Sequence, residues 1–157
     1  TLSLSGSLLD ASYDTFENAQ CGDFELAAGG CDANDARDRS GETLLFAPDY
    51  SVTFGANYDQ PINSDLNFFA DAAAVLSDGY VADSFYNPRN EQSEFAKVDI
   101  RIGLASASGN WEASLFGRNI GDERTISAIN DTVLNGTAST FFLSRGDSFG
   151  ALLRYTY

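Results

Sequence analysis

The sequence has no histidine, and it sets only nine Lys or Arg side chains against 23 Asp or Glu. Without histidine, Ser-His-Asp and Cys-His catalysis are excluded and the commonest metal ligand is missing. The net charge of −14 would repel phosphate backbones, so nucleic acid is a poor partner. We therefore expect no enzyme activity, no cofactor and no nucleic-acid partner.

Long hydrophobic runs are also absent, which excludes a transmembrane helix. The chain begins at Thr1 within a strand-like pattern, without an initiator Met, a basic region or an apolar signal segment. Its 157 residues correspond to a single segment of ordinary domain size. We expect it to be a piece of a longer or processed chain.

The apolar residues alternate with polar ones instead of forming runs. From Ala96 to Leu104 every second residue is apolar, and Lys97, Asp99 and Arg101 lie on the other face. Strands of soluble sheets usually have about five or six residues, whereas a tilted strand needs about 9–11 to cross a bilayer. The pattern predicts membrane-spanning strands whose charged face points into a barrel. The predicted lipid-facing residues are Phe54, Val98, Ile100, Ile102, Leu104, Ala113 and Leu115.

We predict an all-β fold of six long antiparallel strands in an up-and-down meander. The connections after the first, third and fifth strands are long, and those after the second and fourth are short. Long loops on one side and short turns on the other are typical of an outer-membrane barrel. The predicted strands cover residues 1–13, 48–60, 65–78, 94–106, 110–121 and 141–157.

The first predicted loop, from about Phe16 to Thr43, carries both cysteines and many acidic residues. Cys21 and Cys31 lie ten residues apart, and in an oxidising compartment they can close a disulfide. A pair of free thiols is the alternative. The oxygen-rich run CDANDARD is a weak calcium candidate that does not match the EF-hand pattern, and a solvated acidic loop is the simpler interpretation. Its possible ligands are Asp32, Asn34, Asp35 and Asp38.

The second predicted loop, residues 78–94, contains aromatic residues in a polar setting. Exposed aromatic rings beside a cation can stack on a ligand. The alternative is that the rings pack against the loop itself or against the barrel rim. The candidate ligand-binding residues are Tyr80, Phe85, Tyr86 and Arg89.

Two stretches, LLFAPDYSVTFGANY and FAKVDIRIGL, resemble strands near the C-terminal end of a TonB-dependent outer-membrane receptor. The first is similar to the family's entry into a strand that contains Gly and Tyr, and the second resembles another family strand. RGDSFGALLRYTY resembles the family's last strand, in which aromatics alternate to the end of the chain. WEASLFGRNIGDER resembles the best-known signature, through Trp111, Phe116, Gly117, Arg118, Asn119, Ile120, Asp122 and Arg124.

The resemblance implies that these residues are barrel wall and three external loops of a receptor of about 22 strands with an N-terminal plug inside. It implies energised uptake of a scarce nutrient such as a siderophore, cobalamin or a carbohydrate across the outer membrane of a Gram-negative bacterium. The implied partners are the rest of the barrel and its plug, which is absent from this chain. Others are the TonB complex contacted through the missing N-terminal region, outer-membrane lipid with lipopolysaccharide, and the small-molecule nutrient.

Two other readings of the sequence stay open. One is a passive outer-membrane pore or small structural barrel, and the other is a soluble secreted β-sandwich that binds a ligand. A soluble sandwich should have short strands whose apolar faces close on each other, with short turns at both ends.

Overall fold

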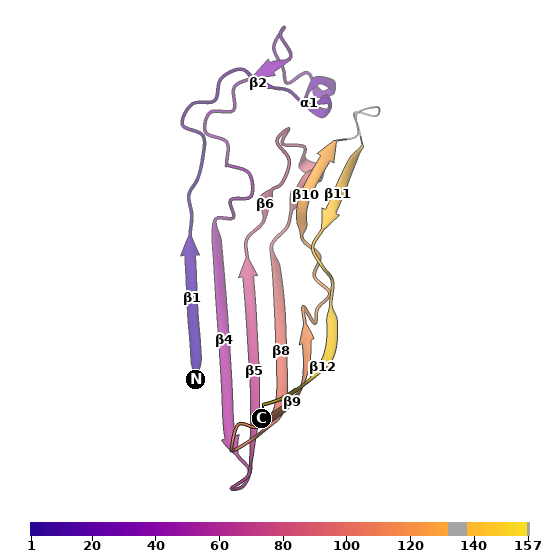
Figure 1. Ribbon diagram of the computed structural model, residues 1–157. Coiled ribbons are helices and arrows are strands. Elements are labelled where there is room, and N and C mark those ends of the chain that lie inside the picture. The colour runs from indigo at the N-terminus through magenta and orange to yellow at the C-terminus, as the bar shows by residue number, and fades with distance from the viewer. Residues whose placement is uncertain (132–137, 157) are drawn as a thin grey trace.

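The computed structural model describes residues 1–131 and 138–156, and its main feature is one sheet of six antiparallel strands (Figure 1). Neighbours in the sheet follow the order of the chain, which confirms the predicted all-β up-and-down meander. The strands are β1 (Leu2–Leu8), β4 (Tyr50–Pro61), β5 (Leu66–Ser77), β8 (Phe95–Ser106), β9 (Trp111–Arg118) and β12 (Ser148–Tyr155).

The register of the sheet gathers the alternating apolar residues on one side, which we call the apolar face. Ala72 on β5 lies opposite Ala56 on β4 and Ile100 on β8, and Ile102 lies opposite Leu115 on β9. Successive side chains of a strand point to opposite sides of its sheet. The charged residues therefore share the other side, the polar face, as the sequence predicts for Lys97, Asp99 and Arg101.

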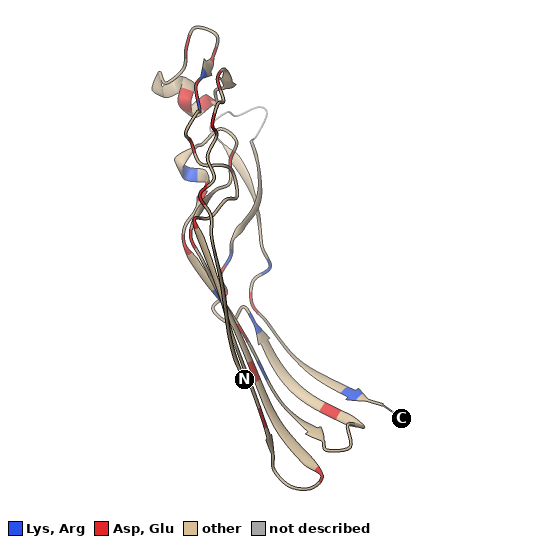
Figure 2. Ribbon diagram, turned by 90° about the vertical axis from the view of Figure 1, so that its left-hand side faces the viewer, with Lys and Arg blue, Asp and Glu red and all other residues tan. Residues whose placement is uncertain are grey.

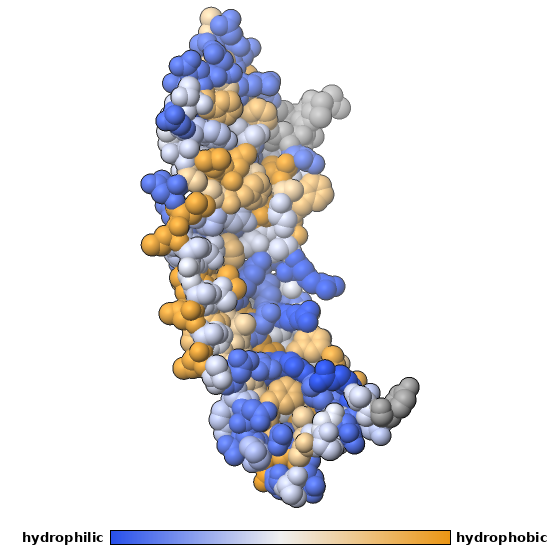
Figure 3. All heavy atoms as spheres, turned by 60° about the vertical axis from the view of Figure 1, so that its left-hand side comes forward, coloured by the Kyte–Doolittle hydropathy of each residue, from blue (hydrophilic) through white to orange (hydrophobic). Residues whose placement is uncertain are grey.

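The apolar face is exposed, and no second layer of helices or strands covers the sheet among the described residues. Ile102 is 46% exposed, Leu115 60% and Leu153 78%. The few apolar residues that are fully buried lie outside the six strands, as Ala19 and Ile126 do. Figure 3 shows hydrophobic side chains along one margin of the molecule and hydrophilic ones in the hollowed side opposite.

The connections are short at one end of the sheet and long at the other, as predicted (Figure 1). Residues 62–65 and 107–110 form the short turns. We call residues 9–49, 78–94 and 119–147 the first, second and third outer loops. They contain the small elements β2 (Ala19–Gln20), α1 (Asp23–Ala28), β3 (Ala36–Arg37), β6 (Tyr80–Val81), η1 (Pro88–Asn90), β7 (Glu91–Gln92), β10 (Ile126–Asp131) and β11 (Ser139–Leu143).

The first and last strands are shorter than the sequence predicts. β1 ends at Leu8 rather than near residue 13, because Leu9 follows directly and breaks the alternation. The chain still runs beside the segment that leads into β4, since Leu9 N–H donates to the carbonyl of Asp49 at 2.8 Å.

Seen edge-on, the sheet curves to one side between the outer loops and the short turns (Figure 2). Many of the acidic residues lie in the outer loops (Figure 2).

The segment predicted as one strand over residues 141–157 contains two strands. β11 pairs with β10 rather than with β9, and β12 begins only at Ser148. Much of the predicted third loop, residues 122–139, is therefore a hairpin arm, and residues 132–137 of that prediction lie outside the described residues. A register shift between Ile126 and Ala128 disturbs the alternation of β10, which hides this strand from a pattern search.

Candidate functional site

A chain of polar contacts crosses the polar face from β4 to β12. Asn57 Nδ2 donates to Asp71 Oδ1 at 2.8 Å, and an oxygen of Asp71 lies 3.8 Å from the Arg101 guanidinium. Arg101 also contacts Glu112, and Glu112 Oε2 accepts a bond from Arg154 at 2.6 Å. Five neighbouring strands each contribute one of these side chains. The register places Asn57, Asp71 and Arg101 opposite one another, and Glu112 opposite Arg154. Arg101 reaches Glu112 diagonally along β9, because the residue directly opposite Arg101 is Phe116. We call these five residues the polar ladder.

Arg101 is the arginine of the ladder with the larger number of side-chain partners. Its Nε donates to Ser114 Oγ at 3.2 Å, and its guanidinium carbon lies 4.8 Å from the centre of the Phe69 ring. Glu112 is the carboxylate between the two arginines, and its side chain is 13% exposed. The two acids and two arginines of the ladder balance in charge, which lets them share a partly covered surface at little electrostatic cost.

The polar face is hollowed around the ladder. Two open hollows of about 910 and 500 Å³ lie here, and both are lined by Asn57, Asp71, Arg101 and Glu112. A charged, hollowed surface suits a polar segment or water more than it suits lipid.

The other charged residues of β8 fasten the third outer loop to the sheet. Lys97 Nζ donates to Thr125 Oγ1 at 2.9 Å and to Ser144 Oγ at 3.0 Å. Asp99 Oδ1 accepts the backbone N–H of Asn119 at 2.8 Å. Thr125 and Ser144 flank the β10–β11 hairpin, and Asn119 directly follows β9. The polar face of β8 is therefore bonded to both ends of the third outer loop.

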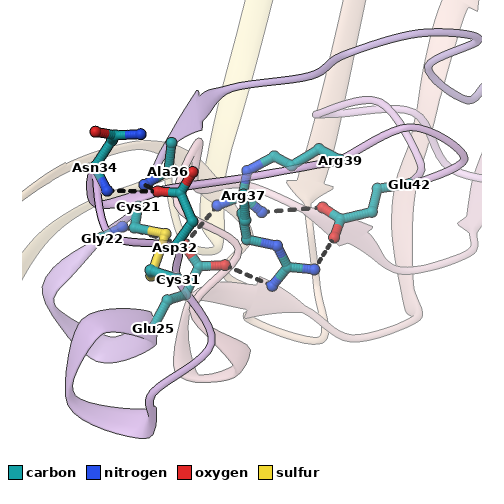
Figure 4. Close-up of a disulfide and its surroundings, with 10 residues drawn as sticks. All are labelled: Cys21, Gly22, Glu25, Cys31, Asp32, Asn34, Ala36, Arg37, Arg39 and Glu42. Carbon is teal, nitrogen blue, oxygen red and sulfur yellow. Dashed lines mark hydrogen bonds and ion pairs between the residues drawn. A yellow bond between two sulfur atoms is a disulfide. The ribbon is translucent and has the colours of Figure 1, made fainter.

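The first outer loop contains a disulfide between Cys21 and Cys31, with Cα atoms 6.4 Å apart (Figure 4). The ring encloses α1, which begins after Gly22 and ends at Gly29 in the left-handed conformation (φ 71°). Glycine adopts this conformation without a steric penalty. Whether the bond is present in the cell stays a prediction.

Two glutamates and two arginines form an ion cluster beside the disulfide (Figure 4). Arg39 bonds Glu25 at 2.6 Å and Glu42 at 2.9 Å, and Arg37 bonds the same two carboxylates. Arg39 is 1% exposed and Glu25 5%. Buried charges need this pairing, because a lone buried ion is strongly unfavourable. The sequence gives no signal for this cluster beyond the charges themselves.

The candidate ligand-binding residues have separate partners in the structure. Tyr80 donates to the carbonyl of Ile126 at 2.7 Å and packs against Phe46. Tyr86 donates to the carbonyl of Thr43 at 2.6 Å and lies under Arg39. The rings of Tyr80 and Tyr86 thus join the outer loops. This is the arrangement expected under the alternative that the rings pack against the loop itself or against the barrel rim.

The environment of these tyrosines keeps their hydroxyls neutral. Burial raises the pKa of Tyr80, and burial more strongly raises the pKa of Tyr86.

The other two candidates, Phe85 and Arg89, differ in exposure. Phe85 packs against Gly22, where an added Cβ would lie 2.6 Å from the Cβ of Phe85. Arg89 is exposed at the surface of the second outer loop. Of the four candidates, Arg89 is the side chain most open to a ligand.

The weak calcium candidate has a structural role in the loop. Asp32 Oδ1 accepts the backbone N–H groups of Asn34 at 2.8 Å and Ala36 at 2.9 Å, and these bonds lower the pKa of Asp32. Asp38 Oδ1 accepts bonds from Ser40. In residues 1–131 and 138–156, no group of three or more Asp, Glu, Cys or His side chains is placed to hold a metal ion.

The second outer loop has a buried polar centre that the sequence analysis missed. Asn90 is 1% exposed, and its Nδ2 donates to Asp83 Oδ2 at 2.9 Å and to Ser139 Oγ at 3.0 Å. Asp83 also accepts the backbone N–H of Phe85 at 3.1 Å. These bonds tie the second outer loop to the third. A pattern search could have flagged Asp83 only as an Asx turn residue.

Comparisons with known proteins relate this fold to a solved receptor structure. No family model and no curated protein matches the sequence. Among solved structures, the chain is similar to the ferric yersiniabactin uptake receptor FyuA from Yersinia pestis, with a TM-score of 0.64 and 19% identity. The match covers 78% of this chain and 18% of that receptor, so the chain spans less than a fifth of its length.

At this identity the likeness concerns the fold alone. The chain has the fold of a section of a TonB-dependent receptor barrel, as its sequence motifs led us to expect. No helix in the described part of the chain is long and apolar enough to cross a membrane.

Proposed function

We propose that this chain forms barrel wall and external loops of an energised outer-membrane receptor that imports a scarce nutrient. The observation that carries the proposal is the sheet with two unlike faces. Its apolar face is continuous from β1 to β12 and exposed, with Leu153 at 78%. Its polar face holds a charge-balanced ladder. Lipid on one side and a wet or plugged lumen on the other suit such a sheet.

A soluble β-sandwich is the less suitable interpretation. A sandwich closes the apolar faces of two sheets on each other, whereas the one large sheet of the described residues leaves residues such as Leu115 exposed. β4, β5 and β8 each have 12 residues, which is enough to cross a bilayer at a tilt. The interpretation of the sheet as membrane-spanning barrel wall implies an outer-membrane location.

Active import, rather than passive flow, is supported by the likeness to an uptake receptor and by the polar ladder. The hollowed polar face suits a plug that fills the barrel, and energised movement of such a plug needs the TonB complex. The partners in this proposal are the rest of the barrel, the plug, the TonB complex, outer-membrane lipid with lipopolysaccharide, and a small-molecule nutrient. The chain itself performs no catalysis in this proposal.

The test is nutrient uptake by cells that carry the intact receptor, with and without the inner-membrane energiser. We expect uptake of one candidate nutrient to stop when the energiser is removed. Uptake that persists would indicate a passive pore. Among loop variants, Arg89→Ala should weaken uptake if the exposed cation contacts the nutrient. Because Arg124 is also exposed but lies in another loop, Arg124→Ala is the matched control.

A further inference from the structure

The disulfide ring of the first outer loop touches the second outer loop directly. Gly22 follows Cys21, and a Cβ added to Gly22 would lie 2.6 Å from the Cβ of Phe85. The Phe85 side chain therefore packs against bare backbone of the ring. Cys21 and Gly22 are both buried, so the ring covers one side of Phe85.

A second contact runs from the ring through two buried charges. Glu25, inside the ring, accepts the backbone N–H of Gly22 at 3.1 Å and a bond from Arg39 at 2.6 Å. The guanidinium carbon of Arg39 lies 4.5 Å from the centre of the Tyr86 ring. The disulfide is thus connected to both Phe85 and Tyr86 of the second outer loop.

The ring encloses Glu25 on the short helix α1. α1 has six residues, and an isolated helix shorter than about 12–15 residues is marginal in water. If the ring opens, Glu25 is no longer held at Arg39. Arg39 would then be a buried cation that has lost one of its two carboxylates, which is strongly unfavourable. It would move to water and leave the Tyr86 ring.

We propose that the Cys21–Cys31 bond is a redox-controlled clamp between the first and second outer loops. In the oxidised state the clamp covers Phe85 and Tyr86. In the reduced state both aromatic faces become open at the outer surface. The clamp depends only on contacts between the loops, so its test is independent of whether the receptor imports a nutrient.

The reductant is a dithiol, and the exchange begins at the half-exposed Cys31 rather than the buried Cys21. A thiolate of the dithiol attacks the Cys31 sulfur, the Cys21–Cys31 bond breaks, and Cys21 leaves as a thiolate. The second thiolate of the reductant then displaces Cys31 from the mixed disulfide. The dithiol is oxidised to a disulfide, the two cysteines are reduced, and the two dithiol protons end on the cysteine sulfurs.

Trypsin cleavage after Arg39 reports the state of the clamp in the intact receptor, folded in detergent. Arg39 is 1% exposed in the closed clamp, so cleavage should be slow under oxidising conditions. With dithiothreitol we expect cleavage to become faster by about tenfold or more, because the site must open locally before a protease can reach it. A tyrosine-reactive label should modify Tyr86 faster under the same conditions.

Variants separate the clamp from a general loosening of the loop. The double variant Cys21→Ser, Cys31→Ser should be cleaved quickly without reductant, and Glu25→Gln should be cleaved quickly although its disulfide is intact. Asp23→Asn is the matched control, because Asp23 is exposed in the same ring and lies outside the ion cluster. Heat-modifiable migration shows that each variant has a folded barrel.

Three results would overturn the clamp. The first is two alkylatable thiols, Cys21 and Cys31, in the native protein before reduction. The second is reduction, verified by mass spectrometry, that leaves cleavage after Arg39 and labelling of Tyr86 unchanged. The third is Asp23→Asn with the same acceleration as Glu25→Gln. If the double variant does not fold, reduction of the folded wild-type receptor still decides the question.

Discussion

Ala72 and Ala73 are neighbours on β5 whose side chains lie on opposite faces of the sheet. Ala72 is paired with Ile100 on the apolar face, and Ala73 is paired with Asp99 on the polar face. Near the middle of a bilayer, an Arg on the lipid face of a barrel costs about 2–4 kcal/mol, whereas lumen positions accept charge. We expect Ala72→Arg to lower the free energy of unfolding by that amount and Ala73→Arg to change it little.

Urea unfolding of the intact receptor in lipid vesicles measures this difference. The two substitutions add the same side chain at adjacent positions, so each is the control for the other. Equal losses of stability in the two variants would contradict the assignment of the faces.

Asp32 provides a pH dependence at the scale of one residue. Its backbone hydrogen bonds, with Ala36 the larger contributor, hold the pKa of Asp32 below its ordinary value. A carboxyl with a lowered pKa stabilises the folded loop above its unfolded pKa, and this stabilisation is lost as the pH falls through the folded pKa. We expect the N–H groups of Asn34 and Ala36 to exchange faster with solvent as the pH falls below about 4, once the acid-slowed intrinsic rate is corrected for.

Hydrogen exchange with mass spectrometry on the intact receptor gives this measurement. In Asp32→Asn the pH dependence at these two amides should disappear. Protection that is the same at pH 3 and pH 7 in the wild-type protein would show that the Asp32 carboxylate does not hold the turn.

The face on which each strand residue lies could be predicted from the sequence, whereas its partners could not. Lys97, Asp99 and Arg101 alternate with apolar neighbours, and a period of two fixes their side of the sheet. Their separate partners depend on the register of other strands and on the course of the third outer loop. The burial of Arg39 has no local signal at all, because Glu25 and Tyr86 are brought to it from distant parts of two loops.

At the scale of elements, the sequence predicts β4, β5 and β8 well and the outer elements poorly. In these strands of 12 residues every second residue is apolar over most of the length, although Phe69, Ala73 and Val75 add apolar residues to the polar face of β5. β10 has a bulge after Ile126, and α1 has only six residues held by the disulfide ring. Elements that depend on contacts with other loops rather than on their own pattern are the ones that a sequence pattern misses.

The polar ladder gives a prediction about how β8, β9 and β12 are held together. Glu112 contacts Arg101 and Arg154, and its side chain is 13% exposed, whereas that of Arg154 is 68% exposed. We expect Glu112→Gln to lower the free energy of unfolding by about 1–2 kcal/mol, since it weakens bonds to two arginines. Arg154→Gln removes one solvent-screened pair and should cost less than about 1 kcal/mol.

Unfolding in urea at two salt concentrations checks the ladder. The difference between the two variants should shrink at high salt, because screening weakens the ion pairs of the wild-type protein. If Arg154→Gln is as destabilising as Glu112→Gln, the central position of Glu112 in the ladder is wrong.

At the scale of the whole molecule, the sheet has two open edges. In the described residues, β1 pairs only with β4, and β12 pairs only with β9. In lipid every unpaired backbone N–H and C=O group costs several kcal/mol, and a bacterial barrel closes with at least about eight strands. In the receptor barrel that we propose, these six strands would therefore pair with further strands beside both β1 and β12; the match to the receptor FyuA covers 18% of that receptor.

The last prediction concerns those two edges. In the intact receptor, the backbone N–H groups on the outer edges of β1 and β12 should be protected from hydrogen exchange as strongly as those of the central strand β5, because both edges are paired with strands outside this chain. In the isolated 157-residue chain in detergent, the edge amides should exchange many times faster than those of β5. Heat-modifiable migration should be present for the intact receptor and absent for the isolated chain. Protected edges together with heat-modifiable migration in the isolated chain would mean that these strands close by themselves, and the assignment of the chain as one part of a larger barrel would then fail.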